Sequence, residues 1–86
     1  MTGLEKLVEL FLREPPEVSF QDVVKVLEAF GYKERASKSG HKVFAKPGEY
    51  PITVPTVKGR RVKRVYVRKI VERLELEEWY EKQHNA

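Results

Sequence analysis

Apolar residues recur at helical spacing through the first dozen positions of the chain. They stand at i, i+3, i+4 and i+7, the pattern of one buried helix face: Leu4, Leu7, Val8 and Phe11. Pro15-Pro16 must end this helix, because proline has no amide hydrogen to donate and its ring obstructs the preceding turn. The pattern therefore predicts a lead-in helix over residues 1–14.

A second helical pattern begins directly after the two prolines. Ser19 followed by Asp22 resembles a capping box, in which the hydroxyl accepts from an exposed amide of the first turn. Gly31 can adopt the left-handed conformation that closes a helix. Between these signals runs an apolar stripe of Phe20, Val23, Val24, Leu27 and Phe30. The second helix is therefore well delimited at both ends.

After Gly31 the spacing changes from helical toward alternating, with turn signals at residues 37–40 and 46–49. This pattern predicts an antiparallel meander of three short strands near Tyr32–Ser37, His41–Lys46 and Ile52–Pro55. In the second strand, alternation alone leaves open which face is buried, because one face would carry His41, Val43 and Ala45 and the other Lys42, Phe44 and Lys46.

Helical spacing returns from about Val65 and continues to about Lys82, after a loop at Lys58-Gly59-Arg60. The order is thus α-α-β-β-β-α. We expect an α+β fold in which the helices pack on one face of a three-stranded antiparallel sheet. A chain of 86 residues is too short for two independent cores, so a single domain over residues 1–86 is expected.

The charges of the chain are separated along it. Residues 32–69 hold 12 basic and 2 acidic side chains, whereas the remainder holds 5 basic and 11 acidic ones, within an overall net charge of +4. So basic a segment attracts polyanions, of which nucleic-acid phosphates are the commonest. A solvated, highly charged surface is the alternative interpretation.

Composition excludes several classes of protein. The chain has no cysteine, which removes disulfide scaffolds, thiolate enzymes and cysteine zinc sites. No apolar run approaches the ~20 residues that cross a bilayer, so we expect a cytoplasmic protein without a membrane partner. Metal-ligand spacings, glycine-rich phosphate loops and nucleophile elbows are absent, and we expect neither a metal nor a small-molecule cofactor.

Four segments in the same order carry a resemblance to a known family. They are Leu27-Glu28-Ala29-Phe30-Gly31-Tyr32, Ser39-Gly40-His41-Lys42-Val43-Phe44, Ile52-Thr53-Val54-Pro55 and Tyr66-Val67-Arg68-Lys69-Ile70. Together they resemble the HicA family of toxins over a core of residues 19–76. The lead-in helix and the acidic helix end and tail at residues 77–86 lie outside the resemblance.

The resemblance implies a small messenger-RNA interferase, an endoribonuclease with a fold like the double-stranded-RNA-binding domain, neutralised by a HicB-type antitoxin. The family's catalytic histidine, which precedes an aromatic residue by three positions, falls on His41, with Phe44 as the aromatic. The chain departs from the family's common Gly-Ser-His order, since it reads Ser39-Gly40-His41. It also has Thr56 after Pro55, where many members carry a second histidine.

His41 is therefore the candidate general acid or base, because imidazole titrates near neutral pH. A second proton transfer would use water or another side chain. The candidates for binding the scissile phosphate are Lys38, Lys42, Arg60 and Arg61. The candidates for an RNA-binding platform at the start of the last helix are Lys63, Arg64, Arg68 and Lys69. The alternative is a non-catalytic RNA-binding module in which His41 is an ordinary strand residue.

Overall fold

The computed structural model describes residues 3–35 and 41–85 of the chain. Its elements in order are α1 (Gly3–Leu12), β1 (Glu17–Ser19), α2 (Phe20–Ala29), β2 (Lys33–Glu34), β3 (His41–Ala45), β4 (Ile52–Pro55), β5 (Arg61–Lys63), α3 (Arg64–Arg73) and α4 (Leu76–Asn85). The predicted turn at residues 37–40, which includes Lys38, lies outside the described residues.

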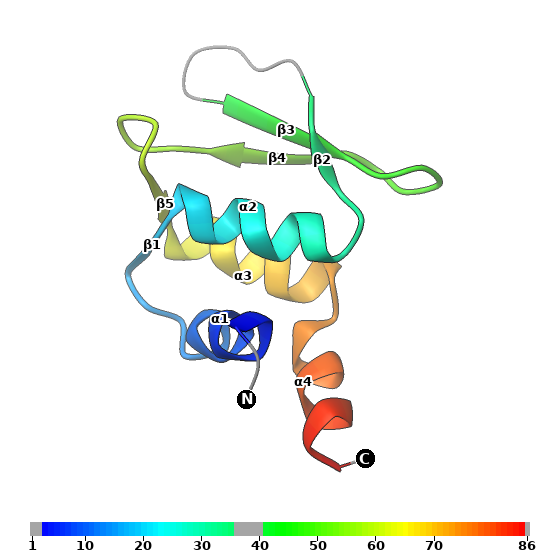
Figure 1. Ribbon diagram of the computed structural model, residues 1–86. Coiled ribbons are helices and arrows are strands. Elements are labelled where there is room, and N and C mark those ends of the chain that lie inside the picture. The colour runs from blue at the N-terminus through cyan, green and yellow to red at the C-terminus, as the bar shows by residue number, and fades with distance from the viewer. Residues whose placement is uncertain (1–2, 36–40, 86) are drawn as a thin grey trace.

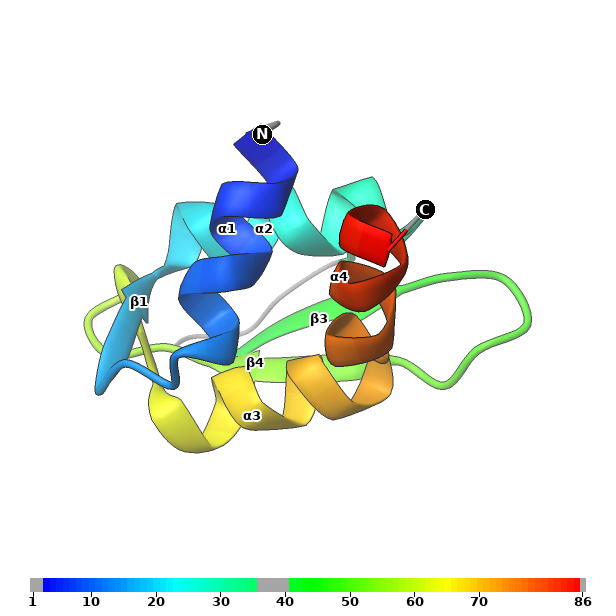
Figure 2. The ribbon, with the colours of Figure 1, turned by 90° about the horizontal axis from the view of Figure 1, so that it is seen from below.

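The expected meander is present as an antiparallel sheet in the order β2-β3-β4. Its register places His41 opposite Pro55 and Phe44 opposite Ile52. All four helices of the described chain lie on one side of this sheet, in two tiers (Figure 1). The helices α2 and α3 pack next to the sheet, and α1 and α4 lie beneath them, as the view from below also shows (Figure 2). The α+β fold class is confirmed and agrees with a double-stranded-RNA-binding-domain-like fold.

The ends of α2 follow the local signals. The Ser19 hydroxyl accepts from the Asp22 amide at 3.1 Å, which satisfies one exposed donor of the first turn. At the other end Gly31 has φ 92°, and the Tyr32 amide donates to the Leu27 carbonyl at 3.0 Å. This hydrogen bond closes the last turn across a left-handed residue, which glycine adopts without steric cost.

The core settles which face of β3 is buried. Phe44 is 0% exposed and lies on the helix side of the sheet with Ile52 and Val54. Alternation along the strand then places Lys42 on that same side and turns His41 to the opposite face. The largest fully buried side chains, which join both tiers of helices to the sheet, are Phe11, Phe44, Leu27, Ile70 and Leu76.

One prediction about the last helix is wrong. The single helix expected from Val65 to Lys82 is interrupted at Leu74-Glu75, where Glu75 has φ 52°, and continues as α4 to Asn85. The break turns Leu76 into the core and carries the acidic end of the chain under α3, against α1. Helical spacing alone did not reveal it, because no glycine or proline marks the position.

The two-stranded sheet formed by β1 and β5 was also not predicted. These strands have three residues each, too few to show alternation, and they pair antiparallel with Glu17 opposite Lys63. The pairing joins the segment after Pro15-Pro16 to the segment before α3. It therefore brings the start of the chain onto its most basic region.

Candidate nucleic-acid interface

His41 is the first residue of β3, at the rim of the sheet. It lies opposite Pro55, the last residue of β4, on the face turned away from the helices. Its side chain is exposed, and the structure shows no hydrogen bond or ion pair for its imidazole with any described residue. The ring is thus open to a ligand arriving at this end of the sheet.

Lys42, the next residue, points the other way. Its ammonium lies 5.9 Å from the centre of the Phe20 ring, at the first turn of α2, and the Phe20 ring in turn lies 6.1 Å from that of Phe44. Consecutive residues of a strand project to opposite faces, so His41 and Lys42 share an end of the sheet but not a face.

The turn at residues 57–61 places Arg60 and Arg61 beside the same first turn of α2. Val57 pairs with Arg61 across the turn, and the Phe20 amide donates to the Arg60 carbonyl at 2.8 Å. An open hollow of ≈ 410 Å³ lies here, lined by Ser19, Phe20, Gln21, Gly59, Arg60 and Arg61. Because β4 runs from Pro55 into this turn, the two arginines lie at the end of the molecule that carries His41 (Figure 1).

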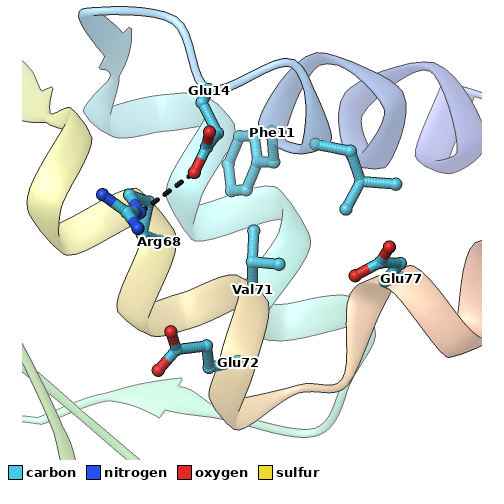
Figure 3. Close-up of a pocket in the computed structure, with 7 residues that line it drawn as sticks. Phe11, Glu14, Arg68, Val71, Glu72 and Glu77 are labelled. Atoms are coloured by element: carbon cyan, nitrogen blue, oxygen red, sulfur yellow. Dashed lines mark ion pairs between the residues drawn. The ribbon is translucent and has the colours of Figure 1, made fainter.

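The basic platform expected at the start of the last helix divides into two parts. Arg64 and Arg68 face the segment that follows α1. The Nε atom of Arg64 donates to the Pro15 carbonyl at 3.4 Å, and the Nε atom of Arg68 lies 2.9 Å from a Glu14 carboxylate oxygen. Figure 3 shows Arg68 reaching from α3 to Glu14 beside Phe11. Lys63 is exposed immediately before the helix.

Lys69 lies on a different side of α3. Its ammonium stands 5.7 Å from the centre of the Tyr66 ring. It borders a hollow between the helix and β4, which is lined by Pro51, Ile52, Thr53, Tyr66, Lys69, Glu72 and Arg73. The four cations that cluster in the sequence therefore do not form a single patch.

Two acidic residues near this surface were not identified from the sequence. Glu17 lies 3.4 Å from the Nε atom of Arg61, and Glu14 pairs with Arg68. Both flank Pro15-Pro16, in a segment whose only apparent signal was the end of a helix. Only the β1–β5 pairing, which spans more than forty residues, brings them to the basic side chains.

The other histidine of the chain lies far from His41 in the fold. His84 is on α4, where its Nε2 atom is 3.7 Å from a Glu5 carboxylate oxygen. The centre of its ring lies 4.2 Å from that of Tyr80, with the two rings tilted by 39°. These contacts belong to the α1 and α4 tier, on the side of α2 and α3 away from the sheet (Figure 1). His84 therefore cannot act on a group held at His41.

The described residues hold neither a metal-binding cluster nor a membrane-spanning helix. Residues 3–35 and 41–85 contain no group of three or more His, Asp or Glu side chains arranged to hold a metal ion. Of the helices in this part of the chain, none has the length and apolar character needed to cross a membrane.

Comparison with known families agrees with the arrangement of the core. The family described as the HicA toxin of bacterial toxin–antitoxin systems matches residues 20–76, which run from the first residue of α2 to the first residue of α4. No curated protein and no solved structure matches the chain. Because the family match covers more than half of the 86 residues, the chain belongs to the HicA family of toxins from bacterial toxin–antitoxin systems.

Proposed function

We propose that this HicA toxin is an endoribonuclease that cleaves messenger RNA, with His41 as its general acid or base. The observation that carries the proposal is the position of His41, exposed at the rim of the sheet opposite Pro55. At the same end of the molecule, Arg60 and Arg61 border an open hollow. Cleavage of a phosphodiester requires a proton-transfer group and cations, and both are present at this end of the molecule.

The chemistry begins in the substrate, because RNA carries its own nucleophile in the 2′-hydroxyl. The imidazole of His41 takes the hydroxyl proton while the 2′-oxygen bonds to the adjacent phosphorus. The bond from phosphorus to the 5′-oxygen then breaks, and that oxygen takes a proton from water or from the imidazolium. The products are a 2′,3′-cyclic phosphate and a 5′-hydroxyl, with every proton accounted for.

The cations stabilise the negative charge that grows on the phosphorane oxygens. Arg60 and Arg61 suit this role because a guanidinium offers two parallel donors to phosphate. Lys42 adds positive charge near Phe20, which lines the same hollow as the two arginines. The rest of the strand of RNA would run along Lys63, Arg64 and Arg68, which are exposed on β5 and α3.

A single histidine implies modest turnover. His84 is engaged with Glu5 and Tyr80 in the other tier of the fold, so it supplies no second proton transfer at His41. A positioned acid or base contributes roughly 10²–10⁴-fold to a rate. An enzyme with one such group is therefore slower, by roughly this factor, than one with two.

We further propose that a HicB-type antitoxin neutralises the toxin by covering the basic end around His41. Carboxylates of the antitoxin would take the place of RNA phosphates on Arg60 and Arg61. The acidic face of α4, with Glu77, Glu78 and Glu81, would repel such a surface. Action on messenger RNA also places the toxin in the cytoplasm, as the composition predicts.

The test is cleavage of end-labelled single-stranded RNA in excess chelator, with and without ribosomes. Wild-type protein should leave 2′,3′-cyclic phosphate and 5′-hydroxyl ends, and His41→Ala should not, although it binds the RNA equally well. His84→Ala is the matched control, because it removes the other imidazole of the chain and should cleave like the wild type. If the wild type binds RNA but never cuts it, the protein is a non-catalytic RNA-binding module.

A further inference from the structure

A short acidic linker contacts three of the arginines proposed to bind RNA, which are Arg61, Arg64 and Arg68. This linker, defined as residues 14–17, leads from the end of α1 into β1. Glu14 pairs with Arg68 at 2.9 Å, and Glu17 pairs with Arg61 at 3.4 Å. Between them, the Pro15 carbonyl accepts from Arg64 at 3.4 Å. Three of the side chains proposed to bind RNA phosphates are thus already in contact with one stretch of four residues.

The three contacts involve the same atom of each arginine. Each arginine uses its Nε atom, which is the inner nitrogen of the guanidinium group. The side chains of Arg61 and Arg68 remain 49% and 60% exposed. Both guanidinium groups are therefore open to a phosphate from the solvent side, but each has a carboxylate beside it.

The position of the linker does not depend on these exposed ion pairs. The Arg64 amide donates to the Pro16 carbonyl at 3.0 Å, and the β1–β5 ladder holds Glu17 opposite Lys63. Backbone hydrogen bonds and the two prolines hold the segment across the start of α3. Removing either negative charge should therefore leave the linker where it is.

The linker also lies outside the part of the chain that matches the HicA family. The match covers residues 20–76, which include the three arginines but neither Glu14 nor Glu17. The segment that precedes the family core thus brings two negative charges onto cations within that core. The two carboxylates are therefore a feature of this chain's N-terminal segment and not of the part that matches the family.

We propose that Glu14 and Glu17 set the affinity of the basic surface for RNA by competing with RNA phosphates for Arg68 and Arg61. The inference rests on the proposed RNA-binding function and names the residues that tune it. A carboxylate beside an arginine reduces the positive charge that a phosphate meets. Exposed pairs of this kind change binding by roughly 1.5- to 5-fold per carboxylate.

The test compares two double variants in the full chain. Glu14→Gln with Glu17→Gln removes both carboxylates, while each glutamine oxygen can still accept from the arginine Nε atom. Glu28→Gln with Glu49→Gln makes the same change in net charge at exposed positions in the last turn of α2 and in the turn between β3 and β4. The probe is a fluorescent single-stranded RNA with 2′-O-methyl groups, which lacks the nucleophile and stays intact.

The linker variant should bind this RNA about 2- to 25-fold more tightly than the wild type, which is the single-carboxylate effect applied twice. The slope of log K against log salt should also steepen, by roughly 0.7 for each arginine that gains a contact with an RNA phosphate. The control variant should change affinity by less than about twofold, because its exposed charges are screened by salt. Thermal unfolding midpoints close to the wild type's establish that both variants are folded.

A second pair of variants tests whether Glu14 acts through Arg68. In an Arg68→Gln background, Glu14→Gln should give no further gain in affinity, since the competed cation is absent. Affinity equal to that of the Glu28 and Glu49 control, weaker binding, or a gain that persists without Arg68 would each overturn the inference. If instead the wild type binds no RNA at any salt concentration, the proposed function itself fails.

Discussion

The hydroxyl of Tyr80 donates a hydrogen bond to a carboxylate oxygen of Glu9 across 2.9 Å, joining α4 to α1. Most of each helix lies outside the residues that match the HicA family. The bond favours the neutral phenol, and it is the main reason that the pKa of Tyr80 is raised above its ordinary value of 10.0. Partial desolvation and the negative charges of Glu9 and Glu5 add to the rise in this pKa.

The raised pKa of Tyr80 makes the contact between α1 and α4 sensitive to alkaline pH. A group whose pKa is higher in the folded state holds its proton more tightly there than when unfolded. Its stabilising contribution is therefore complete below the ordinary tyrosine pKa and is lost as pH rises through the folded value. The ultraviolet absorbance titration of the wild type should contain a late tyrosinate component that Tyr80→Phe lacks.

Glu9→Gln tests whether the hydrogen bond to Glu9 raises the pKa of Tyr80. It removes the negative acceptor and should move the Tyr80 titration back toward the ordinary pKa. A Tyr80 component that titrates at the ordinary tyrosine pKa of 10.0 in the wild type would contradict the prediction.

Phe44→Ala should strongly destabilise the protein. The ring is 0% exposed and packs on Phe20 at 6.1 Å, so truncation leaves a cavity between the sheet and α2. Such substitutions lower the free energy of unfolding by about 3–5 kcal/mol. Chemical denaturation measures the loss. Val43→Ala, on the opposite face of the same strand, should cost about 1 kcal/mol or less, and equal losses would reject this assignment of the faces.

Glu75→Gly should stabilise the protein. Glu75 joins α3 to α4 with φ 52°, a conformation in which a side chain is unfavourable and glycine is not. Its side chain is exposed, so little packing is lost. Relief of this strain should raise the free energy of unfolding by about 1 kcal/mol. Glu75→Val, which is β-branched, should lower it, and a glycine variant less stable than the wild type would contradict the assigned break.

The two hollows that are lined by basic residues should contribute differently to RNA binding. Arg60→Gln with Arg61→Gln removes both cations of the hollow beside α2, and should weaken binding and flatten its salt dependence by roughly 0.7 per lost phosphate contact. Lys69→Gln with Arg73→Gln makes the same charge change in the hollow between α3 and β4. Filter binding at several salt concentrations should show a smaller effect for this second variant. If both variants change the slope of log K against log salt equally, Lys69 also contacts the RNA.

Capping and turn residues in the sequence were sufficient to predict the helix and strands that they bound. Ser19 and Gly31 bracket α2 because a cap and a left-handed residue act within a single helical turn. The strands His41–Ala45 and Ile52–Pro55 were also anticipated, since turn residues separate them from their neighbours. The break before α4 was not anticipated, because burial of Leu76 beneath α3 sets it rather than any local residue preference.

By itself, the sequence determined the α+β class, the resemblance to HicA toxins and the candidacy of His41, because these depend on spacing, composition and order along the chain. Only the tertiary structure decided that His41 and Lys42 face opposite ways at one rim of the sheet, since burial of Phe44 selects the face. It alone also placed Glu14 and Glu17 on arginines more than forty residues away. Pairing between distant strands leaves no periodic trace in three-residue segments, so such contacts become visible only in the folded chain.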